Sequence, residues 1–209
     1  MSDNTIKITL DELLFASLPS PARSTVIEAS VTIERIVGTM LAMFLDIELE
    51  SSKSFGMSTA ALSFNHKIQL LTDMKIIGKD EKALLIKFSE IRNLFAHNAI
   101  ITNFFQCFRH NDLKEYLEKK YGVQKSEFNF EEDNCEMLFN KLFADVKQVC
   151  RDLFQKMINR AGSKGETEGK LLYHEKLLDG IQALCKIDPD FSEKMAKVHD
   201  EAIADIDKK

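Results

Sequence analysis

The chain has 209 residues, with 28 basic and 33 acidic side chains that give a net charge of −5 at pH 7. It is 44% hydrophobic, enough to bury a sizeable core, and its 8 glycines and 3 prolines are few for an all-β sandwich or barrel. The negative balance argues against a generally basic, nucleic-acid-binding surface. We therefore expect a nearly all-helical protein, built as one large domain or as one domain with an appendage.

The predicted helices begin close to the N-terminus. A short helix is expected over residues 9–14, followed by a break at "SLPSPARS". Ser20 then caps a long helix with Pro21 in its first position, where the missing N–H costs nothing. This helix is expected to continue to about Leu49, because apolar residues recur every three or four positions along it, namely Ile33, Ile36, Met40, Phe44 and Ile47.

Two further long helices are predicted before the middle of the chain. One covers roughly residues 59–77, with Gly78 as its stop signal. Asp80 is expected to cap the next helix, which ends near His97 and carries a stripe of apolar residues, Leu84, Phe88, Ile91 and Phe95. The run "AIITNFFQCF" at residues 99–108 is rich in β-branched and aromatic residues, so it fits either a strand or an extension of that helix.

The second half of the chain is expected to complete the bundle. Residues 109–134 are charged and rich in turn formers, which indicates a short helix and a loop, and residues 135–157 show the clearest helical periodicity of all. The hydrophilic stretch 161–170 reads as a linker, and two more helices around "DPD" form a C-terminal hairpin. The predicted fold is all-α: a four-to-five-helix bundle over residues 1–160, then the linker and helical hairpin over residues 161–209.

Four cysteines are widely spaced and form no CxxC pair: Cys107, Cys135, Cys150 and Cys185. With no secretory leader in front of them, they are expected to be free thiols in a reducing cytoplasm. Cys107 and His110 are metal-ligand types three residues apart, but no second pair stands nearby, so no metal and no cofactor are expected. No apolar run approaches the ~20 residues that span a bilayer, so no membrane partner is expected either.

The stretch "EIRNLFAHNAI", residues 90–100, places three polar residues in an apolar helix pattern. Asn93 and His97 are four positions apart and share a face, whereas Arg92 and His97 point about 140° apart around the axis and lie ~7.5 Å apart along it. One regular helix therefore does not bring Arg92 and His97 to one point. Either a break near His97 or a two-fold partner would be needed, and we expect a symmetric homodimer.

These residue types suit the cleavage of a phosphodiester. Histidine can act as acid or base near neutral pH, the planar guanidinium of Arg92 fits two phosphate oxygens, and Asn93 can orient the histidine or donate to the phosphate. A structural role remains open beside this one. His97 at a helix C-terminus is favoured by the macrodipole, Arg92 could pair with Glu28 or Glu34, and Asn93 could cap.

The segment Phe64 to His97, "FNHKIQLLTDMKIIGKDEKALLIKFSEIRNLFAH", resembles the mannitol-repressor-like branch of the HEPN superfamily. The matching signature is an arginine, a polar residue, a short spacer and a histidine, here Arg92, Asn93 and His97. The resemblance implies a helical bundle that dimerises through the motif helices and, in active members, cleaves RNA without a metal. Some toxin members carry a tyrosine two residues after the histidine as a nucleotidylation target; this chain has Ala99 there.

Two functions are therefore expected. The first is a metal-independent ribonuclease of the toxin or defence type, restrained by a protein partner, with RNA as substrate and Arg92, Asn93 and His97 as its catalytic residues. The second is a non-catalytic mannitol-repressor-like regulator, of transcription for example, or an adaptor, which acts through protein–protein contacts while the Arg92–His97 pair only holds the dimer.

Overall fold

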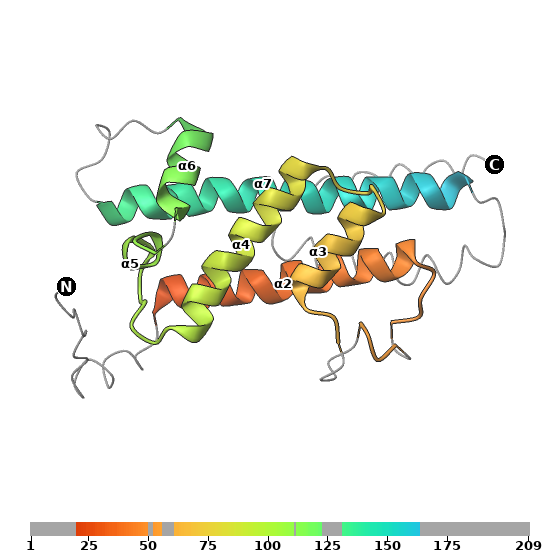
Figure 1. The fold of residues 1–209 in the computed structure, drawn as a ribbon, viewed down its shortest axis with the longest axis horizontal. Helices are drawn as coiled ribbons and strands as arrows, with labels where there is room; N and C mark the ends of the chain where they lie inside the picture. Colours follow the sequence, from red (N-terminus) through yellow and green to blue (C-terminus); the bar gives the residue numbers. More distant parts are fainter. Residues whose placement is uncertain (1–19, 50–51, 56–60, 111, 123–130, 164–209) are drawn as a thin grey trace, which may run out of the picture. The chain divides into compact units, whose positions relative to one another are not determined.

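A computed structural model describes residues 20–49, 52–55, 61–110, 112–122 and 131–163, and these residues form six helices and no strand (Figure 1). The predicted all-α class is confirmed for them. The predicted helix over 9–14, the C-terminal hairpin and all but the first residues of the predicted linker lie outside the described residues. The helices are α2 (Pro21–Phe44), α3 (Phe64–Asp73), α4 (Lys79–His97), α5 (Phe104–Phe108), α6 (Leu113–Tyr121) and α7 (Glu131–Ser163).

The chain divides into two compact units. Within the described part, unit 1 comprises residues 20–30 and 84–145, and unit 2 comprises residues 31–83 and 146–163. The long helices α2, α4 and α7 each contribute one part to unit 1 and the other part to unit 2. The motif residues on α4 all belong to unit 1.

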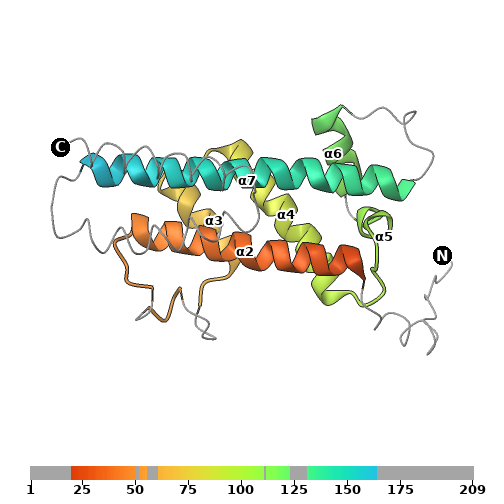
Figure 2. The ribbon, with the colours of Figure 1, turned by 180° about the vertical axis from the view of Figure 1, so that it is seen from behind.

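Unit 1 is organised around stacked phenylalanines. Phe104 from α5 lies 4.7 Å from Phe139 of α7 between ring centroids, and Phe88 of α4 lies 6.3 Å from the same ring. Such pairs contribute ~0.5–1.5 kcal/mol each beyond the area that they bury. Figures 1 and 2 show α5 and α6 beside the first part of α7, which is where this cluster forms. The remaining rings of the cluster are Phe95, Phe108 and Phe143.

Unit 2 encloses the second part of α2. The nine consecutive residues 36–44 are all buried. Gly38 faces the side chain of Lys67 on α3, since a Cβ at this position would lie 3.5 Å from the Lys67 Nζ. Lys67 is buried and forms an ion pair with Glu34 at 3.7 Å, so the ammonium is not left without a counter-charge.

Helix α2 starts as predicted but ends earlier. The Ser20 Oγ accepts from the backbone N–H of Arg23 at 3.2 Å, which is the expected cap in front of Pro21. The helix ends at Phe44 and not near Leu49, because Asp46 adopts φ of 54° and reverses the chain. The backbone N–H of residue 47 then donates to the carbonyl of residue 42, a Schellman ending.

The next helix boundary is also shifted. Helix α3 is shorter than the predicted 59–77 and ends at Asp73, where Lys75 with φ of 58° makes a second Schellman ending. Gly78 does not stop α3. It stands in front of α4, where its N–H donates to the Glu81 carboxylate at 2.6 Å, so Asp80 lies inside the first turn and is not the cap.

Of the later elements, α6 and α7 fall in regions predicted to be helical, whereas the run at 99–108 differs from its prediction. The β-prone run at 99–108 is neither a strand nor an extension of α4, since a loop separates α4 from the short helix α5. Helix α6 falls within the predicted short-helix region and ends at Gly122 with φ of 63°. Helix α7 begins at Glu131 and continues through the first three residues of the predicted linker.

Candidate functional site

The three motif residues lie in the last two turns of α4. The helical pattern is regular there, because the N–H of Asn98 still donates to the Leu94 carbonyl at 3.1 Å. Arg92 and Asn93 are half-buried, whereas His97, the last helical residue, is exposed. The apolar stripe of the same helix is buried as predicted: Leu84, Phe88, Ile91 and Phe95.

The guanidinium of Arg92 is hydrogen-bonded to its neighbour. Its Nη1 donates to the Oδ1 of Asn93 at 2.9 Å. Glu34, one of the two carboxylates considered as partners for Arg92, forms an ion pair with Lys67 at 3.7 Å. The bond to Asn93 fixes the direction of the guanidinium and of the amide together, so these two residues form one rigid polar group on α4.

His97 does not join this group within one chain. Because α4 stays regular to its end, Arg92 and His97 keep the angular separation of about 140° that an ideal helix gives them. The break near His97, one of the two routes that could bring them together, is not observed. A single α4 therefore presents Arg92 and His97 in different directions.

Arg23, in the first turn of α2, is hydrogen-bonded to the backbone that follows α4. The Arg23 Nη2 donates to the carbonyls of Asn98 at 3.1 Å, Ala99 at 2.9 Å and Ile101 at 2.7 Å. These carbonyls belong to the non-helical segment that follows His97, where no regular backbone ladder supplies donors. Sequence reasoning missed Arg23, because nothing in the local pattern links it to a segment more than 70 positions away.

Residues 102–105, which follow these carbonyls, are also hydrogen-bonded to side chains from other parts of unit 1. We call residues 98–103 the exit loop of α4. The Ser20 hydroxyl donates to the Thr102 carbonyl, and the Thr102 N–H donates to Gln106 at 2.8 Å. The carboxylate of Glu132 on α7 accepts from the N–H groups of Phe104 at 2.8 Å and Phe105 at 2.6 Å, which caps α5. Side chains from α2, α5 and α7 thus fix the backbone that follows His97.

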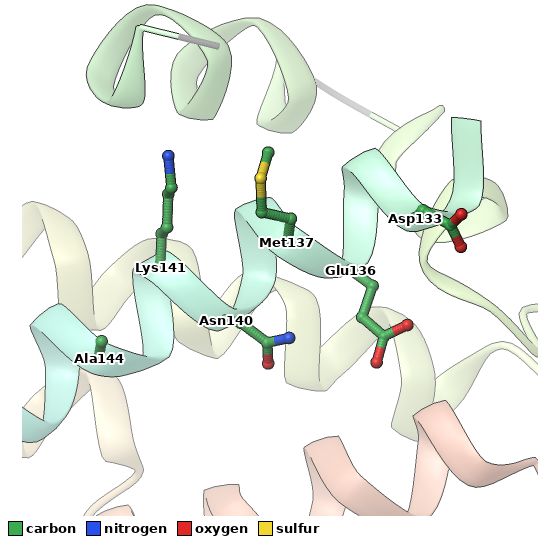
Figure 3. A pocket seen from close by; sticks show the side chains of 6 residues that line it. All are labelled: Asp133, Glu136, Met137, Asn140, Lys141 and Ala144. Atoms are coloured by element: carbon green, nitrogen blue, oxygen red, sulfur yellow. The ribbon is translucent and has the colours of Figure 1, made fainter. Parts of the chain in front are cut away.

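Two of the hollows that the described residues form lie on unit 1. The first, of 440 Å³, is a shallow depression along the exposed face of α7. Figure 3 shows Met137 and Lys141 extending from α7 on the side of α6, and Glu136 and Asn140 extending to the opposite side. Its lining residues are Asp133, Glu136, Met137, Asn140, Lys141 and Ala144.

The second hollow, of 270 Å³, is more enclosed and shares Glu136 and Asn140 with the first. The first turn of α2 and the end of the exit loop complete its wall. Both hollows carry carboxylates, and neither is lined by Arg92, Asn93 or His97. An acidic hollow repels a phosphate, so any phosphodiester chemistry of the motif takes place outside these two hollows.

The described cysteines are buried, and their thiols are expected to be unreactive. Burial raises the pKa of Cys107 and of Cys150 to about 12, and that of Cys135 to about 11. Thiols with such pKa values stay protonated at neutral pH and are poor nucleophiles and poor metal ligands. Cys185 lies outside the described residues.

Among the described residues, no group of three or more His, Cys, Asp and Glu side chains is arranged to hold a metal ion. None of the helices in these residues is both long and apolar enough to cross a bilayer.

Comparison with protein-family models, curated proteins and solved structures gives no match to this chain.

Proposed function

We propose that the protein is a HEPN-like ribonuclease that cleaves RNA without a metal, with each active site shared between two copies of the chain. The observation that supports this proposal best is the regular geometry of α4. His97 is exposed at the helix end, while Arg92 points elsewhere and is fixed by Asn93. A two-fold axis beside α4 would place His97 of one protomer next to Arg92 of the partner subunit.

The surface around His97 is suited to such a contact. Ala96 and Ala99 are exposed, and Ile100 is one of the few exposed large apolar residues, with 39% of its surface accessible. Small apolar side chains allow two helix ends to approach closely without burying charge. The proposed contact is local, and its purpose is to bring the two motifs together.

The proposed reaction is an intramolecular phosphoryl transfer within the RNA, from the 5′-oxygen to the 2′-oxygen. The 2′-hydroxyl loses its proton and its oxygen attacks the adjacent phosphorus. The bond from phosphorus to the 5′-oxygen breaks, and that oxygen takes up a proton, which leaves a 2′,3′-cyclic phosphate and a free 5′-hydroxyl. His97 takes the proton from the 2′-hydroxyl or supplies the proton to the 5′-oxygen, water serves for the other transfer, and Arg92 of the partner subunit stabilises the extra charge on the phosphate oxygens. Asn93 keeps that guanidinium oriented.

The test is RNA cleavage without added metal by wild type, His97→Ala and Arg92→Ala. Loss of a general acid or base typically costs ~10²–10⁴ in rate, so cleavage should fall by that factor while the melting temperature changes little. His110→Ala is the matched control, since it is an exposed histidine of the same unit outside the motif. Equal loss of activity in His110→Ala would argue against a specific role for His97.

A second candidate function is favoured by the acidic hollows on α7. Their carboxylates, which include Asp133 and Glu136, suit contact with a basic segment of another protein. This fits a non-catalytic regulator or adaptor in which the Arg92–Asn93 pair is purely structural. Wild-type protein that cleaves no RNA, together with a His97→Ala variant that only melts lower or dissociates, would decide for this second function.

A further inference from the structure

The arginine that lies at the His97 end of α4 in a single chain is Arg23, and not Arg92. Its Nη2 reaches three carbonyls within 3.1 Å, all of them in the exit loop. Its Nε is buried and has no hydrogen-bond partner among the described groups. Among the described residues, Arg23 is thus held by backbone carbonyls of the exit loop, through one nitrogen that serves three acceptors.

The charge of Arg23 also changes the electrostatics at this point. The C-terminus of a helix carries about half a negative charge, from its unpaired carbonyls. That end is unfavourable for a phosphate, yet the proposed acid or base, His97, is located there. Arg23 brings a full positive charge to the carbonyls that follow this helix end, and that charge offsets the negative field there for a phosphate that approaches His97.

We infer that Arg23 is a positioning residue for His97: it fixes the direction in which the chain leaves α4 and offsets the negative helix end. This inference rests on the proposed ribonuclease function. Arg23 acts through the backbone and does not contact the RNA. A small displacement of His97 is enough to matter, since a misplacement of ~1 Å can cost on the order of 10²-fold in rate.

The experiment compares Arg23→Lys, Arg23→Met and the control Arg35→Met, an exposed arginine of the same helix. Lysine keeps the charge but loses the planar geometry, and methionine loses both. The first measurement is amide hydrogen exchange at residues 100–102 of the full chain. We expect exchange there to be about tenfold faster or more in both Arg23 variants, the factor that the loss of one charged hydrogen bond implies, and unchanged in Arg35→Met.

The second measurement is kcat and KM for cleavage of a single-stranded RNA. Arg23→Lys should lower kcat on the order of 10²-fold with KM nearly unchanged, because only the position of His97 is disturbed. Arg23→Met should also raise KM, because the negative helix end is then uncovered.

The outcomes separate this inference from the proposed function. Unchanged exchange at residues 100–102 in both Arg23 variants overturns the inference, whatever the activity. Faster exchange with unchanged kcat and KM also overturns it, since Arg23 would then be a helix cap without influence on His97. If wild type cleaves no RNA, the ribonuclease proposal fails, and the role of Arg23 in the exit loop is decided by the exchange data alone.

Discussion

At the scale of single residues, Lys87 links α4 to the start of α6 through contacts with two carboxylates. Its Nζ donates to Glu90 at 3.0 Å and to Asp112 at 2.9 Å, and it lies 5.4 Å from the centre of the Tyr116 ring. Burial lowers the pKa of Lys87, but the hydrogen bonds to Asp112 and Glu90 outweigh this effect, so the pKa is raised overall. The same contact lowers the pKa of Asp112 below its ordinary value of 3.8.

This contact predicts a specific pH dependence. A carboxyl whose pKa is lowered on folding contributes stability that is present above its ordinary value of 3.8 and is lost as the pH falls through the folded pKa. Lys87, with its raised pKa, contributes stability that is lost only above pH 10.5. Asp112→Asn should therefore melt at a lower temperature than wild type at pH 6. The difference between the two melting temperatures should shrink as the pH falls below 3.8.

The measurement is the melting temperature of both proteins from pH 6 down to pH 2.5. Asp133→Asn is the control, because it removes an exposed carboxylate from the same unit. A constant difference between wild type and Asp112→Asn over the whole range would contradict the assigned role of the Lys87–Asp112 contact.

At the scale of elements, the sequence allowed the start of α2, the end of α4 and the buried stripe of α4 to be predicted, but not the ends of α2 and α3. Ser20 and Pro21 marked the start of α2, and periodicity identified Leu84, Phe88, Ile91 and Phe95 as buried. The predicted ends are Leu49 for α2 and Gly78 for α3, whereas both helices end earlier, on left-handed residues that are not glycine. Lysine rarely adopts this conformation, so no local signal pointed to it.

The motif residues of the candidate site could be predicted from the sequence, but the residues that fix the backbone after His97 could not. Arg92, Asn93 and His97 were chosen because polar residues interrupt an apolar pattern in α4. Arg23 and Glu132 fix the exit loop from α2 and α7, and such contacts between distant segments leave no trace in local periodicity. Their roles follow from the tertiary structure alone.

The end of α3 gives a prediction of its own. Lys75 has φ of 58° and an exposed side chain, and a left-handed conformation costs a residue with a Cβ roughly 1–2 kcal/mol. Lys75→Gly should remove this strain and stabilise the protein by about 0.5–1 kcal/mol after the entropy of glycine is offset. Urea unfolding measures the change.

The matched control is Lys119→Gly, which replaces an exposed lysine inside α6. It should destabilise by about 1 kcal/mol, because glycine is a poor helix former. A loss of stability in Lys75→Gly as large as that in Lys119→Gly would show that the left-handed turn after α3 is not strained.

At the scale of the whole molecule, the account depends on a second copy of the chain. The described residues confirm an all-α helical bundle, and α4 is regular up to His97. With that geometry one chain does not offer His97 and Arg92 to the same phosphate. The proposed ribonuclease must therefore build each site from His97 of one protomer and Arg92 of the partner subunit.

Mixing two inactive variants tests this claim most directly. His97→Ala and Arg92→Ala are purified separately, combined under conditions that allow subunits to exchange, and assayed for RNA cleavage without added metal. In a mixed dimer one site keeps both residues and the other loses both. After random exchange half of the dimers are mixed, so activity should recover to about a quarter of wild type. A mixture no more active than its two components, with subunit exchange verified by mass spectrometry, would contradict the shared site.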